Sequence, residues 1–189
     1  MIYLDIIEAK KIYEKGKNIT QYLKKKFDIS QNTPEIIEIA YDIQARSYIK
    51  KFENNKVKTK LYANELGGIL NKHVTDGDSL LDIGTGELTT LTLMLNQIKV
   101  SFSEILAFDI SWSRLKKGKD FFKLNKKKST FKVSTFVADI ESIPLHSKCI
   151  DVVTSSHALE PNGKNLSLLL NELFRITKKN WYYLNHHMN

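Results

Sequence analysis

The residues best placed to do chemistry lie in the segment Leu80–Glu87, which reads Leu-Leu-Asp-Ile-Gly-Thr-Gly-Glu. Gly84 and Gly86 allow backbone N–H groups to approach a ligand closely, and the helix predicted to follow them presents its positive end there. Asp82 precedes the first glycine by two positions. A carboxylate in this turn favours a cationic group and opposes the pyrophosphate of a dinucleotide. The segment therefore predicts a ligand that carries a positive charge beside a nucleoside.

The turn departs from the dinucleotide-binding pattern Gly-x-Gly-x-x-Gly. Thr85 fills the variable position between the two glycines, whereas Thr89 stands where that pattern places its third glycine. A nicotinamide-dependent oxidoreductase is therefore a poor fit to this turn. A second interpretation of Asp82 stays open, because aspartate is common near helix starts and could simply cap the helix that follows.

A second carboxylate follows the next predicted strand, Ile105–Phe108. Asp109 ends this strand at about the 20-residue spacing beyond a glycine turn at which an acidic side chain binds ribose hydroxyls. A carboxylate there can accept hydrogen bonds from both hydroxyls, and Ile110 offers an apolar face to an adenine ring. Asp109 could alternatively cap a helix predicted over residues 111–125.

The glycine turn and the carboxylate after it resemble the first motifs of the class I S-adenosylmethionine-dependent methyltransferases. The resemblance implies that Gly84, Thr85 and Gly86 hold the methionine part of S-adenosyl-L-methionine. It also implies that Asp82 lies near the ammonium group of this cofactor, which agrees with the positive charge predicted from the turn.

Asp139 and Ile140 repeat the pairing of a carboxylate with an aliphatic residue after a third predicted strand, residues 131–138. In the family that the chain resembles, such a pair binds the adenine amino group and stacks on the adenine ring. Asp139 could alternatively form a turn before Pro144.

A fourth predicted strand, Cys149–Ser155, continues into Ser156 and His157. Asp151, an apolar pair and small polar residues in this order resemble the family's fourth motif, which borders both cofactor and substrate. The resemblance places Ser155 at the cofactor. His157 is the candidate catalytic residue, because a neutral imidazole could accept the proton of a substrate hydroxyl. A structural hydrogen-bonding role for this histidine is the alternative.

The elements that position these residues alternate between strands and helices from Ser79 onward. A helix over residues 166–176 and a strand over Trp181–Leu184 complete the order. This pattern predicts an α/β fold with a Rossmann-like, doubly wound, mostly parallel sheet and helices on both faces. We therefore assign residues 76–189 to a cofactor-binding domain and residues 1–75 to an N-terminal helical extension that forms a cap or lid.

The N-terminal region shows helical spacing and no strand-like alternation. Thr33 and Pro34 form a good helix start, as N-cap and first helical residue. The helix is predicted to continue far enough to place Tyr41, Gln44 and Tyr48 on one face. This stretch is similar to a Tyr-Asp…Tyr segment of many small-molecule methyltransferases, where it forms part of a lid, so Tyr41 is a candidate cofactor contact. Alternatively, these tyrosines are half-buried packing residues.

Composition limits the classes of protein that the chain can belong to. Its 189 residues support one domain with an accessory segment. No run of about 18 apolar residues exists to cross a membrane, and the N-terminus lacks the basic start and long apolar stretch of a signal peptide. The single cysteine, Cys149, falls in a predicted buried strand and cannot form an intramolecular disulfide, so a cytoplasmic location is expected. Metal ligation is unsupported, because His186 and His187 are adjacent, which is poor chelate geometry.

The net charge of +8 suggests a nucleic-acid partner at first sight. Lysines occur in runs at 24–26, 116–117 and 126–128, but aromatic residues do not alternate with them as a single-strand binding surface requires. Methyltransferases of exocyclic base amines typically carry an Asn- or Asp-Pro-Pro-aromatic segment after the fourth strand, where this chain has Ser-Ser-His-Ala at 155–158. A small-molecule substrate is therefore favoured and a nucleic acid is not.

The family that the chain resembles has two further strands, an antiparallel pair beside the fifth strand. The tail after the fifth predicted strand, residues 185–189, is too short and too polar to supply that pair. We therefore expect either a shortened chain or a covered sheet edge, with a second copy in a homo-oligomer or a partner chain as the cover.

Together these features predict an S-adenosyl-L-methionine-dependent methyltransferase that acts on a small molecule and not at a membrane. Two alternatives stay open at this stage. One is a truncated or degenerate protein that binds the cofactor without turnover, and the other is a nucleic-acid-associated methyltransferase.

Overall fold

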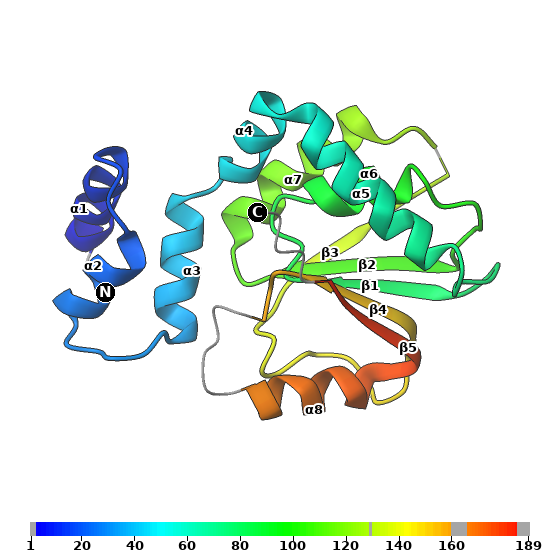
Figure 1. Cartoon of the computed structure of the whole chain (residues 1–189). Coiled ribbons are helices and arrows are strands. Elements are labelled where there is room, and N and C mark those ends of the chain that lie inside the picture. The colour runs from blue at the N-terminus through cyan, green and yellow to red at the C-terminus, as the bar shows by residue number, and fades with distance from the viewer. Residues whose placement is uncertain (1–2, 129, 160–165, 185–189) are drawn as a thin grey trace.

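A central parallel sheet organises the molecule, and Figure 1 shows it nearly edge-on. The computed structural model describes residues 3–128, 130–159 and 166–184. Within these residues the sheet has five strands in the order β3-β2-β1-β4-β5, and all neighbouring strands are parallel. The strands are β1 (Ser79–Ile83), β2 (Glu104–Asp109), β3 (Ser134–Val137), β4 (Ile150–Ser156) and β5 (Thr177–Leu184).

β1 is the centre of the sheet, and all of its residues are buried. Leu80 packs with the apolar cluster on one face, whereas Leu81 and Ile83 pack with the cluster on the other, as strand alternation requires. The chain runs outward from β1 to β3 and then adds β4 and β5 on the other side, so the winding direction reverses between β1 and β4. The predicted Rossmann-like, doubly wound sheet is confirmed. Ligands of such sheets bind at the carboxyl ends of the strands where the winding reverses.

Helices cover both faces of the sheet, as Figure 1 shows. On one face Leu66, Leu91 and Phe122 pack against the strands, and on the other Leu169 and Leu173 do so. Burying such a side chain contributes about 1.5–3 kcal/mol, so the two layers form a rigid scaffold for the loops at the carboxyl edge. The helices of the first face are α5 (Lys56–Leu70), α6 (Thr89–Leu95) and α7 (Trp112–Asn125), and the helix of the second is α8 (Leu166–Ile176).

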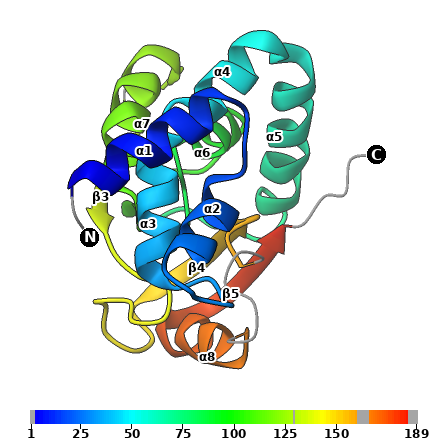
Figure 2. The same cartoon turned by 90° about the vertical axis from the view of Figure 1, so that its left-hand side faces the viewer.

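The first three helices form a cluster beside the sheet, and Figure 2, viewed from that side, shows them in front of it. Thr33 caps α3 as predicted, because its hydroxyl accepts a hydrogen bond from the Ile36 N–H. The buried core of the cluster comprises Ala9, Ile19, Leu23, Ile36 and Ala40. The helices are α1 (Tyr3–Glu14), α2 (Ile19–Lys26) and α3 (Pro34–Ile43).

The helix predicted to continue through Tyr48 is two helices. α3 ends at Ile43, and α4 (Ser47–Asn54) begins after Arg46, whose φ of 86° lies in the left-handed region. The carboxylate of the buried Glu87 accepts hydrogen bonds from the Arg46 N–H and from a second amide in the first turn of α4. A distant side chain therefore caps α4 and starts a new helix. The prediction of a single helix face for the tyrosines was wrong.

α5 begins at Lys56, because the Asn55 side chain caps it by accepting a hydrogen bond from the Lys58 N–H. Cys149 is exposed and precedes β4, so the expectation that it is buried in a strand was wrong. Over residues 3–128, 130–159 and 166–184, no helix is long and apolar enough to cross a membrane, and no group of side chains could hold a metal ion.

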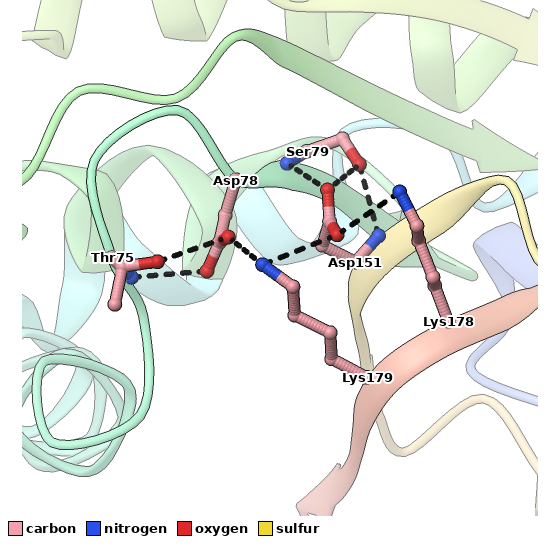
Figure 3. Close-up of polar contacts among 6 residues, drawn as sticks. All are labelled: Thr75, Asp78, Ser79, Asp151, Lys178 and Lys179. Atoms are coloured by element: carbon pink, nitrogen blue, oxygen red, sulfur yellow. Dashed lines mark hydrogen bonds and ion pairs between the residues drawn. The ribbon is translucent and has the colours of Figure 1, made fainter.

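A polar cluster at the amino ends of the strands joins β1, β4 and β5, and Figure 3 shows it in detail. Asp151, near the start of β4, accepts hydrogen bonds from the Ser79 N–H at 3.0 Å and the Ser79 hydroxyl at 2.8 Å. Lys179 of β5 lies between Asp151, at 3.3 Å, and the buried Asp78. The bonds from Ser79 and the nearby lysines lower the pKa of Asp151 to about 2. This carboxylate joins the strands at the end of the sheet opposite the glycine turn, so within the fourth motif Asp151 has a structural position.

Candidate functional site

A cavity of about 830 Å³ opens at the carboxyl edge of the sheet, within the range of roughly 300–1,000 Å³ that ligand pockets occupy. The loops after β1, β2, β3 and β4 form one side of it, and residues of α4 and α5 form another. The fold gathers every predicted site residue at this cavity except one. The predicted residues that line it are Tyr41, Asp82, Gly84, Thr85, Gly86, Asp109, Ile110, Asp139, Ile140 and His157.

Ser155 is the exception. Its side chain is fully buried within β4 and lies outside the cavity lining, whereas the next residue, Ser156, lines the cavity. Successive strand residues face opposite sides of a sheet, which separates the buried Ser155 side chain from the cavity that Ser156 lines. The hydroxyls of Ser156 and Tyr62 share a hydrogen bond of 2.7 Å. Tyr62, on α5, also lines the cavity and was not predicted from the sequence.

The turn between β1 and α6 requires glycine for backbone and steric reasons. The φ angles of Gly84 and Gly86 are 61° and 57°, in a region that L side chains rarely adopt. A Cβ on Gly84 would also lie 2.2 Å from the Cβ of Ala158 in the loop after β4. The Thr85 N–H donates to the Phe108 carbonyl at 2.9 Å. The turn is therefore held tightly against the ends of both neighbouring strands.

Asp82 presents a buried carboxylate to the cavity from β1. It is 7% exposed, and its Oδ1 accepts a hydrogen bond from the Thr154 hydroxyl at 2.8 Å. Burial raises the pKa of Asp82 to about 6, although hydrogen bonds from Thr85 and Thr154 oppose the rise. The N-cap position of α6 is Leu88, so Asp82 does not cap that helix. A cationic ligand group would relieve the cost of this buried charge, whereas a pyrophosphate would increase it.

Asp109 ends β2 with its carboxylate fixed by two backbone amides. Its Oδ2 accepts a hydrogen bond from the Gly86 N–H and its Oδ1 one from the Ser111 N–H, both at 2.9 Å. Burial raises the pKa of Asp109, and these amides together with the positive charge of Arg114 oppose the rise. Ser111, not Asp109, is the N-cap of α7. Each carboxylate oxygen keeps a further lone pair with which to accept a ligand hydroxyl.

The loop after β3 brings a third carboxylate and an apolar side chain to the cavity. Asp139 Oδ1 accepts a hydrogen bond from the Glu141 N–H at 3.0 Å. Asp139 therefore forms a turn and also lines the cavity, so its two interpretations are compatible. Ile140 is buried, and together with Ile110 it gives the cavity apolar surface suited to a flat ring.

His157 lies directly after β4 in a left-handed backbone conformation, with φ of 59°. This conformation is uncommon for a residue other than glycine and costs about 1 kcal/mol or more. The imidazole is exposed and lines the cavity, and its ring centroid lies 6.2 Å from that of Tyr62. The structure thus places a titratable ring at the cavity, within reach of solvent.

Two carboxylates anchor the N-terminal helices at the site. Glu87, in the glycine turn and 1% exposed, accepts hydrogen bonds from the first amides of α4 at 2.6 and 2.8 Å. Burial raises the pKa of Glu87, and these amides oppose the rise. Asp42, near the end of α3, accepts hydrogen bonds from the Ser111 hydroxyl at 2.5 Å and from the Ser113 N–H at 3.1 Å. The helical extension is therefore tied to the glycine turn and to the start of α7.

Arg114 lines the cavity and was missed by the sequence analysis. It is 4% exposed, and its guanidinium lies over the ring of Tyr41, 3.7 Å from the ring centroid. The same guanidinium donates a hydrogen bond to Gln44 at 3.1 Å and lies 5.1 Å from the ring centroid of Tyr48. The two tyrosines, on different helices, therefore meet at one buried cation.

A sequence pattern for Arg114 did exist. On α7 it shares a buried face with Gly118, Phe121 and Phe122, at helical spacing. A charged residue on the apolar face of a helix requires partners, because burying an unpaired charge is costly. The carboxylates of Asp109 and Glu87 supply the opposite charge, since Arg114 opposes the rise that burial causes in the pKa of each.

The doubly wound sheet, the glycine turn with its carboxylate and the acidic residues after β2 and β3 define a Rossmann-like S-adenosylmethionine-dependent methyltransferase domain. The sequence model described as Methyltransferase domain matches residues 74–189, which is more than half of the chain. The chain belongs to this family, and S-adenosyl-L-methionine is the cofactor that membership implies.

Solved structures share this fold at low sequence identity. A protein of Methanococcus maripaludis assigned as an S-adenosyl-L-methionine-dependent methyltransferase is 18% identical, with a TM-score of 0.60 over 76% of this chain and 63% of its own. A protein assigned as a methyltransferase, solved in complex with the Haloferax volcanii Trm112 methyltransferase activator, is 20% identical, with a TM-score of 0.58 over 76% of this chain and 58% of its own. A methyltransferase of Aquifex aeolicus is 20% identical, with a TM-score of 0.56 over 74% and 70%.

The chain spans about six-tenths of the length of the first two of these proteins. No curated protein matches the sequence significantly.

Proposed function

We propose that the chain transfers a methyl group from S-adenosyl-L-methionine to a small-molecule acceptor. The observation that carries the proposal is the row of carboxylates at the cavity: Asp82, Asp109 and Asp139 follow three different strands and converge there. The cofactor carries an ammonium group, two ribose hydroxyls and an adenine amino group. Each is a donor or a cation, and each needs an acceptor of this kind.

The glycine turn fits the methionine end of the cofactor. A Cβ on Gly86 would meet no atom nearer than Tyr48 at 3.9 Å, so the backbone here borders open space. Asp82 would hold the ammonium group, whose positive charge offsets the burial that raises the pKa of this carboxyl. An anionic ligand at the same place would leave the buried charge uncompensated.

The other strand ends fit the adenosine end. Asp109 would accept hydrogen bonds from the ribose hydroxyls on the lone pairs that Gly86 and Ser111 leave free. Asp139 would accept one from the adenine amino group, and Ile140 would lie against the adenine ring. Tyr41, stacked on Arg114, would close the same end of the cavity from the helical extension.

When bound, the cofactor supplies a methyl group on a positively charged sulfur, which is electrophilic without further activation. The chain then has to hold the acceptor's lone pair in line with the methyl–sulfur bond and exclude water. Residues of α4 and α5, with Tyr62 and Ser156, line the part of the cavity left for the acceptor. His157 would accept the proton that an oxygen or nitrogen acceptor releases.

A small acceptor is supported by the helices that line the cavity. Residues of α4 and α5 line the cavity together with the loops at the strand ends, so the space for an acceptor is bordered by both. A base within a nucleic acid would have to be flipped out of its stack to reach such a site.

The test is to incubate the protein with S-adenosyl-L-methionine and to measure S-adenosylhomocysteine formation with a panel of small alcohols, amines and acids. DNA and RNA oligonucleotides form a second panel. We expect turnover with a member of the first panel and a loss of at least tenfold in His157→Ala, with His146→Ala, an exposed histidine outside the cavity lining, as the matched control. Methylation of oligonucleotides alone would refute the small-molecule acceptor. Cofactor binding without turnover in either panel would favour a non-catalytic binding protein.

A further inference from the structure

Another part of the cavity carries positive charge that the cofactor does not use. The end of α4 and the start of α5 contribute a continuous set of basic and amide side chains to the lining. We call this set the basic wall, and it consists of Lys50, Lys51, Asn54, Asn55 and Lys58.

Among the residues that the structure describes, no carboxylate forms an ion pair with the basic wall. Glu53, on the same helix, forms an ion pair with Arg46 at 3.9 Å. In the part of the chain that the structure describes, none of the three lysines of the basic wall forms an ion pair. Lys50, Lys51 and Lys58 thus bring three ammonium groups without an ion-pair partner among the described residues to the lining of the cavity.

The start of α5 adds to this positive charge. The first turn of a helix favours acidic side chains, because unpaired N–H groups give that end a positive partial charge. The first turn of α5 has no acidic residue and contains Lys58 instead. A residue that lowers the stability of a helix without an evident compensating contact is expected at a functional site.

The charges of the cavity are therefore segregated. The carboxylates of Asp82, Asp109 and Asp139 come from the strand ends, and the ammonium groups of Lys50 and Lys58 come from α4 and α5. A cofactor bound at the carboxylates leaves the basic wall for the second substrate. An anionic group attracted to the lysines and repelled by the carboxylates has a defined orientation, with the rest of the molecule directed into the cavity.

We propose that the methyl acceptor is a small anion, with a carboxylate or a phosphate monoester held by Lys50, Lys51 and Lys58. The amides of Asn54 and Asn55 supply further hydrogen-bond donors to the same group. This inference rests on the proposed function, because it concerns the acceptor of that reaction.

The test measures binding of simple anions to protein saturated with S-adenosylhomocysteine, and in parallel to protein without it. Benzoate and phenyl phosphate serve as anionic probes and distinguish the two anion types, and benzamide serves as the neutral control. Binding is followed by changes in backbone amide NMR shifts. The variant K50Q/K51Q/K58Q removes the charges of the basic wall, and K117Q/K119Q/K123Q removes as many from α7, outside the cavity lining.

We expect one of the anions to bind with shifts in α4 and α5, and benzamide to bind at least tenfold more weakly. The basic-wall variant should weaken the anion by about eightfold or more, since each of three exposed charges contributes roughly two- to fivefold. The α7 variant should stay within about twofold of the unchanged protein. Added salt should weaken the anion in the unchanged protein and have little effect in the basic-wall variant.

Three results would overturn the inference. The first is equal binding of benzamide and benzoate, or anion binding that the basic-wall variant leaves unchanged. The second is a loss of S-adenosylhomocysteine affinity in that variant while its affinity for adenosine, which has no carboxylate, is unchanged. That result would assign the lysines to the carboxylate of the cofactor. The third is binding of a single-stranded oligonucleotide by a protein that binds neither benzoate nor phenyl phosphate. Failure of the proposed function would look different, because S-adenosylhomocysteine would then not bind the unchanged protein, or would bind while no acceptor in either panel is methylated.

Discussion

The buried carboxylate of Asp82 makes a quantitative prediction about stability. Burial raises its pKa from an ordinary 3.8 to about 6, which corresponds to about 3 kcal/mol of unfavourable free energy for the ionised form. Asp82→Asn removes that charge and keeps an oxygen that can accept the Thr154 hydroxyl. At about pH 8 the variant should therefore be more stable than the unchanged protein by about 3 kcal/mol, or roughly 6–12 °C in melting temperature.

The effect should depend on pH with a defined sign. Between about pH 4 and pH 6 the folded chain keeps a proton on Asp82 that the unfolded chain has released. The free energy of unfolding of the unchanged protein should therefore fall as the pH rises through this window, and it should fall by more than that of the variant, which keeps the buried Asp109 and Glu87. The advantage of the variant should shrink by about 2 kcal/mol between about pH 8 and pH 4.5.

The same substitution should weaken cofactor binding, although it stabilises the folded protein. If Asp82 holds the ammonium group, Asp82→Asn should weaken S-adenosylhomocysteine binding at least tenfold at about pH 8. In the unchanged protein, affinity should fall as the pH drops below about 6, because the carboxyl becomes protonated. Thermal unfolding and calorimetric titration measure the two effects, with Asp120→Asn, an exposed aspartate on α7, as control. A variant that is less stable at pH 8, or equally stabilised at both pH values, would refute this account of Asp82.

Three other substitutions test the scaffold and the helical extension. Asp151→Asn should lower the free energy of unfolding in urea by about 2 kcal/mol near neutral pH, with cofactor affinity unchanged, since its pKa is lowered to about 2. Because this carboxyl is stabilising when ionised, its contribution to the free energy of unfolding should disappear as the pH falls from about 4 towards 2. A changed cofactor affinity in Asp151→Asn would contradict the position of Asp151 at the amino ends of the strands. Gly84→Ala should destabilise by more than about 2 kcal/mol in thermal unfolding, because its Cβ clashes at 2.2 Å. Gly68→Ala on α5, where a Cβ meets no atom within 4 Å, should be stabilising by about 0.5–1 kcal/mol, and equal effects of the two would contradict the turn geometry. Arg114→Met removes the cation that opposes the rise in the pKa of Asp109. As the pH is lowered, cofactor affinity should therefore begin to fall at a higher pH in this variant than in the unchanged protein. The same pH dependence of affinity in both proteins would show that this charge does not act on the site.

The parts of the site that depend on local sequence were predictable. Leu80–Ile83 reads as a buried strand, and two glycines at positive φ mark the turn after it. Asp109 and Asp139 were placed by their positions at strand ends, and the parallel topology brings such ends to one edge of the sheet. Short buried strands and glycine turns carry their signals within a few residues, so sequence alone identifies them.

Features that depend on distant contacts were not predictable. The break between α3 and α4 arises because Glu87 caps α4 from more than 35 positions away in the chain. No helical period in the sequence records that contact, so Tyr48 was placed on the wrong helix. The meeting of Tyr41 with Arg114 likewise depends on how α3 packs on α7.

In β4 the location of each side chain depends on strand register and on strand direction. A shift by one residue reverses the face to which a strand residue points, which is why Ser156 and not Ser155 lines the cavity. Asp151 belongs to the motif but stands near the amino end of the strand, where Ser79 binds it. A motif shows which residues occur together, whereas only the fold shows which end of the strand each one occupies.

Calorimetric titration with S-adenosylhomocysteine is the most direct test of the central claim that the carboxylates at the strand ends form a cofactor site. The titration should compare the unchanged protein, Asp109→Asn and the exposed control Asp120→Asn, with NAD as the competing ligand class. We predict micromolar binding of S-adenosylhomocysteine, a loss of at least tenfold in Asp109→Asn alone, since the ribose hydrogen bonds depend on a charged acceptor, and no binding of NAD. Binding of NAD in preference to S-adenosylhomocysteine, or S-adenosylhomocysteine binding that Asp109→Asn leaves unchanged, would contradict the account.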